Sequence, residues 1–152
     1  MPMDIRFARA GDIPQLLMLI RRYWDFEGIE GFAALRIELL LKELLTHRPE
    51  RGLIWVAESQ GALLGYLIVM LLMSVEHQGL MGEIDEFFVL PEARSCGIGT
   101  RLLAAAEEVL RQQGCVRLQL QLATANSRAR PFYERHSFAA RGDYELLDKP
   151  LK

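Results

Sequence analysis

The order of apolar and polar positions divides the first half of the chain into a strand, two helices and a hairpin. Residues 3–9 alternate between apolar and polar side chains, the pattern of a half-buried strand. Apolar residues then recur at helical spacing from about 13 to 24 and from about 35 to 47, which predicts two amphipathic helices. The apolar runs 53–58 and 62–73 are joined at Ser-Gln-Gly, which is typical of a β-hairpin.

The second half predicts three or four more strands and two more helices. In order, these are a strand at 80–90, a helix that ends at Gly114, a strand at 116–122, a short helix at 126–135 and one or two closing strands within 138–147. The full order is β-α-α-β-β-β-α-β-α-β. It predicts an α/β domain with a mixed sheet.

Composition and charge narrow the class of protein. The 152 residues, 51% of them hydrophobic and 25% charged, suit one globular domain spanning residues 1–152. A net charge of -2 gives no general attraction to nucleic acid, and the longest apolar run, 62–73, is shorter than the ~20 residues of a membrane helix. Two cysteines, Cys96 and Cys115, with no secretory signal before them favour free thiols and a cytoplasmic location.

The segment 89–100, Val-Leu-Pro-Glu-Ala-Arg-Ser-Cys-Gly-Ile-Gly-Thr, connects a strand to a helix through a glycine-containing turn. Glycines let the backbone approach an anion closely, and the N-H groups at the start of a helix favour phosphate. Arg94 and Arg101 add positive charge. A tight strand-to-helix turn without a ligand has the same pattern, but the residues that define dinucleotide and nucleotide-triphosphate loops are absent.

In this context the sequence resembles the GNAT superfamily of N-acetyltransferases, whose cofactor motif is Gln/Arg-x-x-Gly-x-Gly/Ala after a strand ending in Val-x-Pro. Arg94, Gly97 and Gly99 match that motif in register. Residues 126–138 resemble the second family signature, Asn-x-x-Ala-x-x-Phe-Tyr-Glu-x-x-Gly-Phe, with Ser137 where glycine is usual. The two matches stand in the family's order and spacing, and the resemblance extends over the whole chain.

The resemblance implies a GNAT-like fold, with a mixed, mostly antiparallel central sheet of six to seven strands flanked by about four helices. It also implies acetyl-coenzyme A as the acyl donor, with its pyrophosphate on the backbone amides of the turn and its pantetheine arm along the preceding strand. The cofactor-binding residues assigned in this way are Phe87, Phe88, Val89, Arg94, Ser95, Cys96, Gly97, Ile98, Gly99, Thr100, Asn126 and Tyr133. By the same resemblance Tyr133 protonates the leaving thiolate, although an aromatic pair such as Phe132-Tyr133 also serves simply as core packing.

Three carboxylates, Glu83, Asp85 and Glu86, interrupt an otherwise apolar strand, and such interruptions often mark functional sites. Strict alternation places Glu83 and Asp85 on one face and Glu86 on the other. Glu83 aligns with the general-base glutamate of histone-acetylating family members, while Asp85 and Glu86 fall where small-molecule members often carry carboxylates. We expect the base among them, with Glu83 and Glu86 preferred and Asp85 a candidate for acceptor binding. Each could instead be a solvated or ion-paired carboxylate.

Residues 23–32 mix aromatic and acidic side chains, and their place after the first strand suggests a wall of the acceptor site. Trp24, Asp25 and Glu27 are the candidate acceptor-binding residues, since aromatic faces and carboxylates both attract cations. This composition suits an acceptor with more than one amine. An acidic surface loop anchored by its aromatic residues explains it equally well.

The expected mechanism is direct transfer: a carboxylate or water chain takes a proton from the acceptor amine, and backbone N-H groups near Phe88 stabilise the oxyanion. Cys96 lacks the His or Asn pattern of a covalent nucleophile, and His47, His77 and His136 lack metal-ligand spacing, so no metal is predicted. A non-catalytic acyl-coenzyme A-binding module is the alternative, against which the intact Tyr133 argues. The acceptor, a small molecule or a protein, stays open, as does a homodimer.

Overall fold

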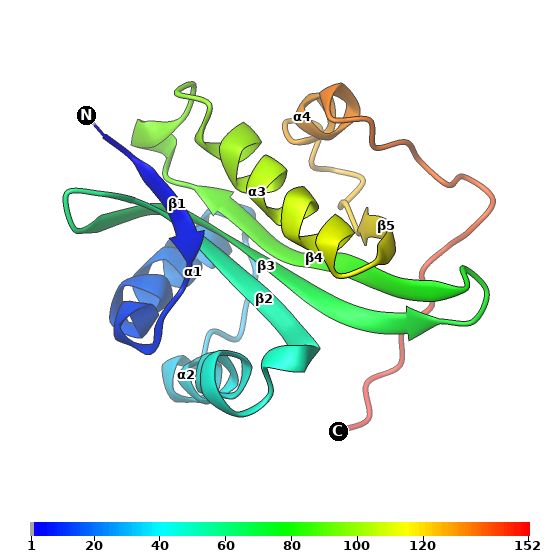
Figure 1. The fold of residues 1–152 in the computed structure, drawn as a ribbon, viewed down its shortest axis with the longest axis horizontal. Coiled ribbons are helices and arrows are strands. Elements are labelled where there is room, and N and C mark those ends of the chain that lie inside the picture. The colour runs from blue at the N-terminus through cyan, green and yellow to red at the C-terminus, as the bar shows by residue number, and fades with distance from the viewer. Residues whose placement is uncertain (1) are drawn as a thin grey trace. The chain divides into compact units, whose positions relative to one another are not determined.

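The computed structural model describes residues 2–152, which form two compact units (Figure 1). The first unit ends at Leu120 and holds the whole sheet and the three longest helices, and the second is Gln121–Lys152. Each unit is described by itself below. None of the helices in residues 2–152 combines the length and the apolar character that crossing a membrane requires.

The first unit is built on a five-stranded sheet. In sheet order its strands are β1 (Asp4–Phe7), β2 (Gly52–Ser59), β3 (Ala62–Ser74), β4 (Gly79–Val89) and β5 (Cys115–Leu120). Neighbours from β1 to β4 pair antiparallel, and β4 pairs with β5 in parallel. The predicted hairpin is confirmed, and its turn has φ of 51° at Gln60 and 81° at Gly61, the pair of left-handed residues that suits a two-residue hairpin turn.

Helices cover both faces of this sheet (Figure 1). These are α1 (Ile13–Glu27), α2 (Ala34–Lys42), which continues as a π-helical turn at Glu43–His47, and α3 (Ile98–Gln112). The apolar stripes of α1 and α2 pack with one set of sheet residues in a single cluster that includes Leu16, Tyr66 and Phe88. The buried stripe of α3 packs on the other face, where its Leu110 approaches Gly82 of β4. The confirmed architecture is therefore a mixed α/β sandwich.

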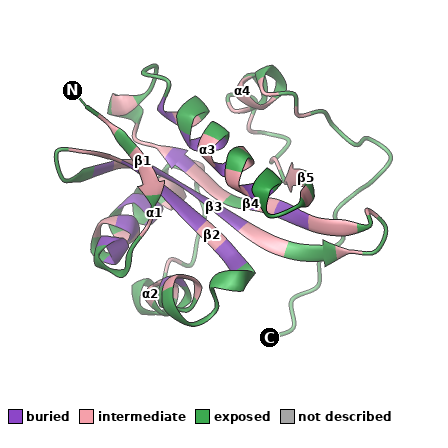
Figure 2. Ribbon diagram, in the orientation of Figure 1, coloured by how far each residue is buried: buried purple, intermediate pink, exposed green. Residues whose placement is uncertain are grey.

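The core follows the centre of the sheet, where most of β2 and the first half of β3 are buried (Figure 2). Trp55, Val56, Tyr66 and Leu67 are among the most deeply buried side chains. These runs are buried on both faces because helices cover both, which explains why they read as continuous apolar segments in the sequence. Tyr66 differs from its apolar neighbours because it has a hydroxyl, which needs a hydrogen-bond partner inside the core.

An arginine ties the start of α1 to the sheet. Arg6 on β1 donates from Nη1 to Asp12 Oδ2 at 2.8 Å and from Nε to Glu58 Oε1 of β2 at 2.9 Å. Asp12 also accepts the backbone N-H of Arg9 at 2.7 Å. The hydrogen bond from Arg6 is the main reason why the pKa of the buried Asp12 carboxyl is lowered. Both carboxylates are thus paired with a cation.

Two predictions about the fold are corrected. The sheet has five strands rather than six to seven, because residues 138–147 form no strand within the described second unit. They instead contain a turn in which Tyr144 N-H donates to Arg141 O at 3.1 Å. A segment forms a strand only where another strand supplies partners for its backbone N-H and C=O groups. The first helix also continues beyond Trp24 to Glu27, where Gly28, with φ of 71°, ends it.

Candidate active site

The two halves of β4 differ in their strand partners. The parallel ladder with β5 ends at the pair Ile84–Leu120, whereas β4 continues to Val89. From Asp85 onward, β4 pairs only with β3 within residues 2–120. Within residues 2–120 no strand lies beside the other edge of this part of β4, and sheet edges of this kind can bind an extended ligand. The predicted cofactor residues Phe87, Phe88 and Val89 lie on this half-paired part.

The turn after β4 presents the first amides of α3. A short 3-10 turn at Pro91–Ala93 leads to Ser95 and Gly97, whose φ angles of 68° and 75° are both left-handed. The Arg101 N-H donates back to Gly97 O at 3.0 Å and closes the first turn of α3. The N-H groups that precede it, such as those of Ile98 and Gly99, have no acceptor inside a helix. A helix start with this geometry favours an anion.

Two arginines connect this turn with the end of α1. Arg94 donates from Nε to Val89 O at 3.0 Å, and its guanidinium lies 4.9 Å from the ring centroid of Phe26 and 5.7 Å from that of Phe88. Arg22 of α1 donates to Glu92 of the turn at 2.8 Å. The turn before α3 and the predicted acceptor wall, residues 23–32, are therefore in contact within the first unit.

Two aromatic residues of the predicted acceptor wall, Phe26 and Phe32, contact arginines of the protein itself. Arg94 covers Phe26, and the guanidinium of Arg21 lies 5.2 Å from the ring centroid of Phe32. These faces are occupied by the protein's own arginines, so they do not support the idea of an aromatic cage for a cationic acceptor.

A β-bulge sets the direction of the three carboxylates. Ile68 of β3 pairs with Glu86 and the next residue, Val69, pairs with Ile84, so Asp85 is the extra residue on β4. Met70 pairs with Glu83. Since paired residues share a face, Glu83 and Glu86 both lie on the side of Ile68, the side that α1 covers. The expectation that Glu83 and Glu86 face opposite ways was wrong, because the bulge shifts the alternation by one residue.

The three carboxylates have different partners. Glu86 accepts two hydrogen bonds, from the indole Nε1 of Trp24 to Oε2 at 2.7 Å and from the hydroxyl of Tyr66 to Oε1 at 2.8 Å. Glu83 Oε1 accepts Nε2 of Gln119 on β5 at 2.7 Å. Across residues 2–152, no hydrogen bond or ion pair reaches Asp85. Nor does any Lys, Arg or His of the described chain pair with Glu83 or Glu86.

Burial and like charges shape the titration of this site. Burial raises the pKa of Glu86, the hydrogen bonds from Trp24 and Tyr66 oppose that rise, and Asp85 adds to it. Asp85 is exposed by surface area, yet nearby protein removes part of its hydration, which together with Glu83 raises its pKa. Tyr23 of α1 has its pKa raised to about 12 by burial and then by the nearby carboxylates, Glu86 first. The cluster therefore forms a negative site that favours cations.

The second unit contains the downstream signature. Its helix α4 spans Arg130–Arg135, and Asn126 Oδ1 accepts the N-H of Ala129 before that helix begins. The ring of Tyr133 packs edge-on against Phe132 and Phe138, with centroids 5.4 and 5.5 Å apart. These contacts satisfy the packing interpretation of Tyr133 and leave its proposed acid role as a prediction.

The end of α4 shows how Ser137 replaces a glycine. Its φ is 69°, in the left-handed region. Ser137 N-H donates to Glu134 O at 3.1 Å and Phe138 N-H donates to Tyr133 O at 3.0 Å, the two bonds of a Schellman helix end. Serine therefore takes the conformation that glycine adopts more easily, and the turn geometry is kept.

Sequence reasoning missed Tyr66 and the hydrogen bond that Trp24 forms. Trp24 donates its indole N-H to Glu86, and its predicted contact with the acceptor stays a prediction. Tyr66 lies inside the apolar run 62–73 and is fully buried. A lone hydroxyl in such a run was the available signal, because a buried tyrosine needs a polar partner. Asp25 is exposed and Glu27 half-buried at the end of α1.

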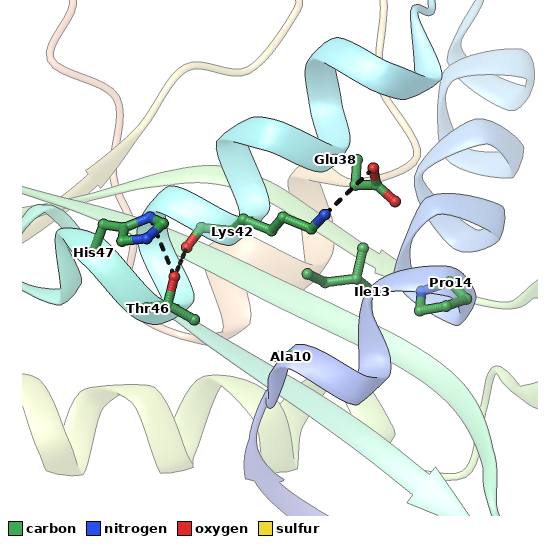
Figure 3. A pocket seen from close by; sticks show the side chains of 7 residues that line it. All are labelled: Ala10, Ile13, Pro14, Glu38, Lys42, Thr46 and His47. Carbon is green, nitrogen blue, oxygen red and sulfur yellow. Dashed lines mark hydrogen bonds and ion pairs between the residues drawn. The ribbon is translucent and has the colours of Figure 1, made fainter.

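An open pocket of about 380 Å³ lies elsewhere in the first unit, where the start of α1 meets α2 (Figure 3). Its walls are Ala10, Ile13, Pro14, Glu38, Lys42, Thr46 and His47. Lys42 Nζ lies 3.7 Å from Glu38 Oε2, so the charge of Lys42 is partly neutralised by this ion pair. None of the predicted site residues lines this pocket. In the described part of the chain, no three His, Cys, Asp or Glu side chains cluster in a way that could hold a metal.

Comparison with known proteins identifies relatives of the whole chain. An uncharacterised N-acetyltransferase, YhfO of Bacillus subtilis, is 29% identical over 143 residues, covering 90% of this chain and 89% of the relative. The aminoalkylphosphonate N-acetyltransferase of Salmonella typhimurium is 34% identical over 140 residues, covering 89% of this chain and 84% of the relative. Both relatives match along nearly their full length.

A solved structure shares the fold. The crystal structure of a predicted acetyltransferase with acetyl-CoA from Clostridium acetobutylicum superposes with a TM-score of 0.81 at 20% identity, covering 97% of this chain and 96% of the other. Residues 14–138 match the acetyltransferase (GNAT) family. The match includes β4, the turn before α3 and α4, and so the chain belongs to the GNAT family of acetyltransferases.

Proposed function

We propose that this protein, as one domain of residues 1–152, moves an acetyl group from acetyl-coenzyme A directly to a primary amine. The observation that carries the proposal is the arrangement along β4. One open edge leads to an anion-favouring turn, and three carboxylates without a cationic partner in residues 2–152 lie at the bulge where that edge begins. A donor site and an amine-attracting site thus share one strand.

The residues of the turn fit the donor. The backbone of Ser95 to Thr100 would hold the pyrophosphate, and Phe87 to Val89 would run beside the pantetheine arm. A Cβ added to Gly97 would meet nothing within 4 Å, so the backbone there is open to a ligand. The fold neighbour crystallised with acetyl-CoA supports this choice of donor. When bound, acetyl-coenzyme A supplies a thioester carbonyl for the amine to attack.

Asp85 is the carboxylate best suited to take the proton of the amine. It accepts no hydrogen bond from residues 2–152, whereas Glu83 and Glu86 already do. Its raised pKa makes it a stronger base than an ordinary aspartate. This order differs from the sequence-based one, which preferred Glu83 and Glu86. The named acceptor of the Salmonella relative is an aminoalkyl compound, which supports an amine acceptor here.

The remaining roles follow the family pattern. Backbone N-H groups near Phe88 would stabilise the oxyanion, and Tyr133 would protonate the leaving thiolate. The second candidate function is a non-catalytic acyl-coenzyme A-binding module. The unpaired carboxylate of Asp85 favours the enzyme, because a module that only binds the donor has no need of a base beside it.

A panel of amines incubated with acetyl-coenzyme A tests the proposal, with mass spectrometry detecting products that are heavier by one acetyl group. We expect at least one acetylated amine and a matching release of thiol. A parallel thermal melt separates the candidates, because a ligand that binds only the folded state raises the melting temperature whether or not it reacts. Stabilisation without product favours the binding module, and the absence of both contradicts the proposal.

A further inference from the structure

The carboxylate of Glu86 is held from two sides by neutral donors. The Trp24 indole of α1 donates to one oxygen at 2.7 Å and the Tyr66 hydroxyl of β3 donates to the other at 2.8 Å. The two donors come from different layers of the first unit. Together they fix the plane of the carboxylate, which a single hydrogen bond cannot do.

The chemistry of these donors leaves the negative charge in place. Asp12 and Glu58 are also held by hydrogen bonds, but their donor is Arg6, which cancels charge. Trp24 and Tyr66 carry no charge, and no Lys, Arg or His within residues 2–152 pairs with Glu86. Each carboxylate oxygen can accept more than one hydrogen bond, so the Glu86 oxygens keep capacity for another donor. A fixed anion without a counter-ion is what a cationic ligand needs.

We propose that Trp24 and Tyr66 are positioning residues that hold Glu86 in one orientation as the anion that recognises the ammonium group of the acceptor. The inference rests on the proposed acetyl transfer to an amine. Tyr66 has 0% of its surface exposed, so it acts through Glu86 and not by touching the acceptor. Glu86 binds and orients the amine, and Asp85, beside it on the bulge, takes the proton.

Other titratable groups face the same space and define what a titration will report. On β4 these are Asp85 and Glu83, and on α1 they are Tyr23 and Glu27, while Tyr66 approaches from β3. Burial and the neighbouring Asp85 raise the pKa of Glu86, and the hydrogen bonds from Trp24 and Tyr66 oppose that rise. Removing a donor should therefore raise the pKa of Glu86, whereas removing the Asp85 carboxylate should lower it.

The first measurement needs no turnover. The carboxyl ¹³C shift of Glu86 is followed against pH in protein labelled at glutamate, and Glu86→Gln identifies the signal. In Tyr66→Phe and Trp24→Phe the pKa of Glu86 moves upward, because each lost donor favoured the ionised form. Tyr23→Phe is the matched control: it removes the same hydroxyl from a neighbouring tyrosine that, across residues 2–152, forms no hydrogen bond with Glu86.

The second measurement is a double-mutant cycle on the best amine of the panel. Tyr66→Phe raises KM for the amine on the order of tenfold, while KM for acetyl-coenzyme A stays unchanged. In the Glu86→Gln background the same substitution adds little, because the charge that Tyr66 positions is gone. A purely structural Tyr66 would give equal effects in both backgrounds and would change both KM values.

Each outcome decides one question. An unmoved Glu86 pKa in both donor variants, or independent effects in the cycle, overturns the positioning roles. If Tyr66→Phe does not fold, Trp24→Phe provides the same test, because Trp24 is only half-buried and its substitution disturbs the core less. A protein that acetylates no amine removes the proposed function instead, and the titration still reports whether the donors act on Glu86.

Discussion

The turn before α3 and the carboxylates of β4 are neighbours in the chain, but they acquire their geometry in different ways. The turn is local: Pro91, Gly97 and the start of α3 determine its course within a few residues. The carboxylates are not. Their directions depend on a bulge against β3, and the hydrogen bonds of Glu86 come from residues 62 and 20 positions away in the chain.

This contrast separates the features of the site that can be predicted from sequence from those that cannot. A motif whose backbone conformation depends on glycine and proline keeps its meaning wherever the chain is placed. A side chain on a strand changes face when one residue is inserted in the ladder, and no pattern along β4 alone announces that residue. Substitutions in each of the two regions test this division.

Gly97→Val should abolish the stabilisation by acetyl-coenzyme A. A β-branched residue is strained at φ of 75°, and the turn must distort to relieve it. Gly114→Val is the control, because Gly114 also has a left-handed φ, of 83°, and open space around it, at the other end of α3. Thermal melts with and without the donor check this. Equal ligand-induced shifts in both variants would mean that the turn does not hold the donor.

Asp85→Asn should lower turnover on the order of 10³-fold and remove the acidic limb of the pH-rate profile, which reflects protonation of the base. The same change should raise the melting temperature at pH 7. A carboxyl with a raised pKa in the fold destabilises it once ionised, so this cost is present above the folded pKa and disappears as pH falls below the unfolded value. The gain should therefore vanish near pH 3. The pH-rate profile of Glu83→Gln is measured for comparison. If the acidic limb is lost only in Glu83→Gln, then Glu83 and not Asp85 is the base.

Tyr133→Phe should slow turnover on the order of 10²-fold if the phenol protonates the leaving thiolate. Its aromatic contacts with Phe132 and Phe138 are kept by phenylalanine, so stability and donor affinity should change little. Steady-state kinetics and a donor melt measure the two effects separately. Unchanged turnover would assign Tyr133 to packing alone.

Ser137→Gly should stabilise the protein by about 1 kcal/mol, because glycine adopts the left-handed φ of 69° without the steric cost that serine carries. Turnover should stay the same, since the backbone of the helix end does not change. Denaturant unfolding measures the gain. A loss of stability would show that the serine hydroxyl makes a contribution larger than the backbone strain. The result tests whether the stability of the turn after α4 is determined by its own residues, as the conformation of the turn before α3 is.

The fold was predictable where local pattern and tertiary context agree. The strand at β1, the hairpin of β2 and β3, and the start of α3 were expected from alternation, apolar runs and turn residues. Residues 138–147 were also expected to contain one or two strands but form none in the second unit, since a strand needs a partner as well as a suitable sequence. The pattern also ended α1 too early, at Trp24 instead of Glu27.

The family and the backbone of the turn before α3 could be predicted from the sequence alone, because glycine, proline and helix-start residues act within a few positions of the chain. The shared face of Glu83 and Glu86, the lack of a hydrogen-bond or ion-pair partner for Asp85 in residues 2–152, and the neutral donors of Glu86 could be found only in the folded structure. Orientation on a strand and the environment of a charge depend on what packs against them. For this protein those partners lie on β3 and α1, far from β4 in sequence.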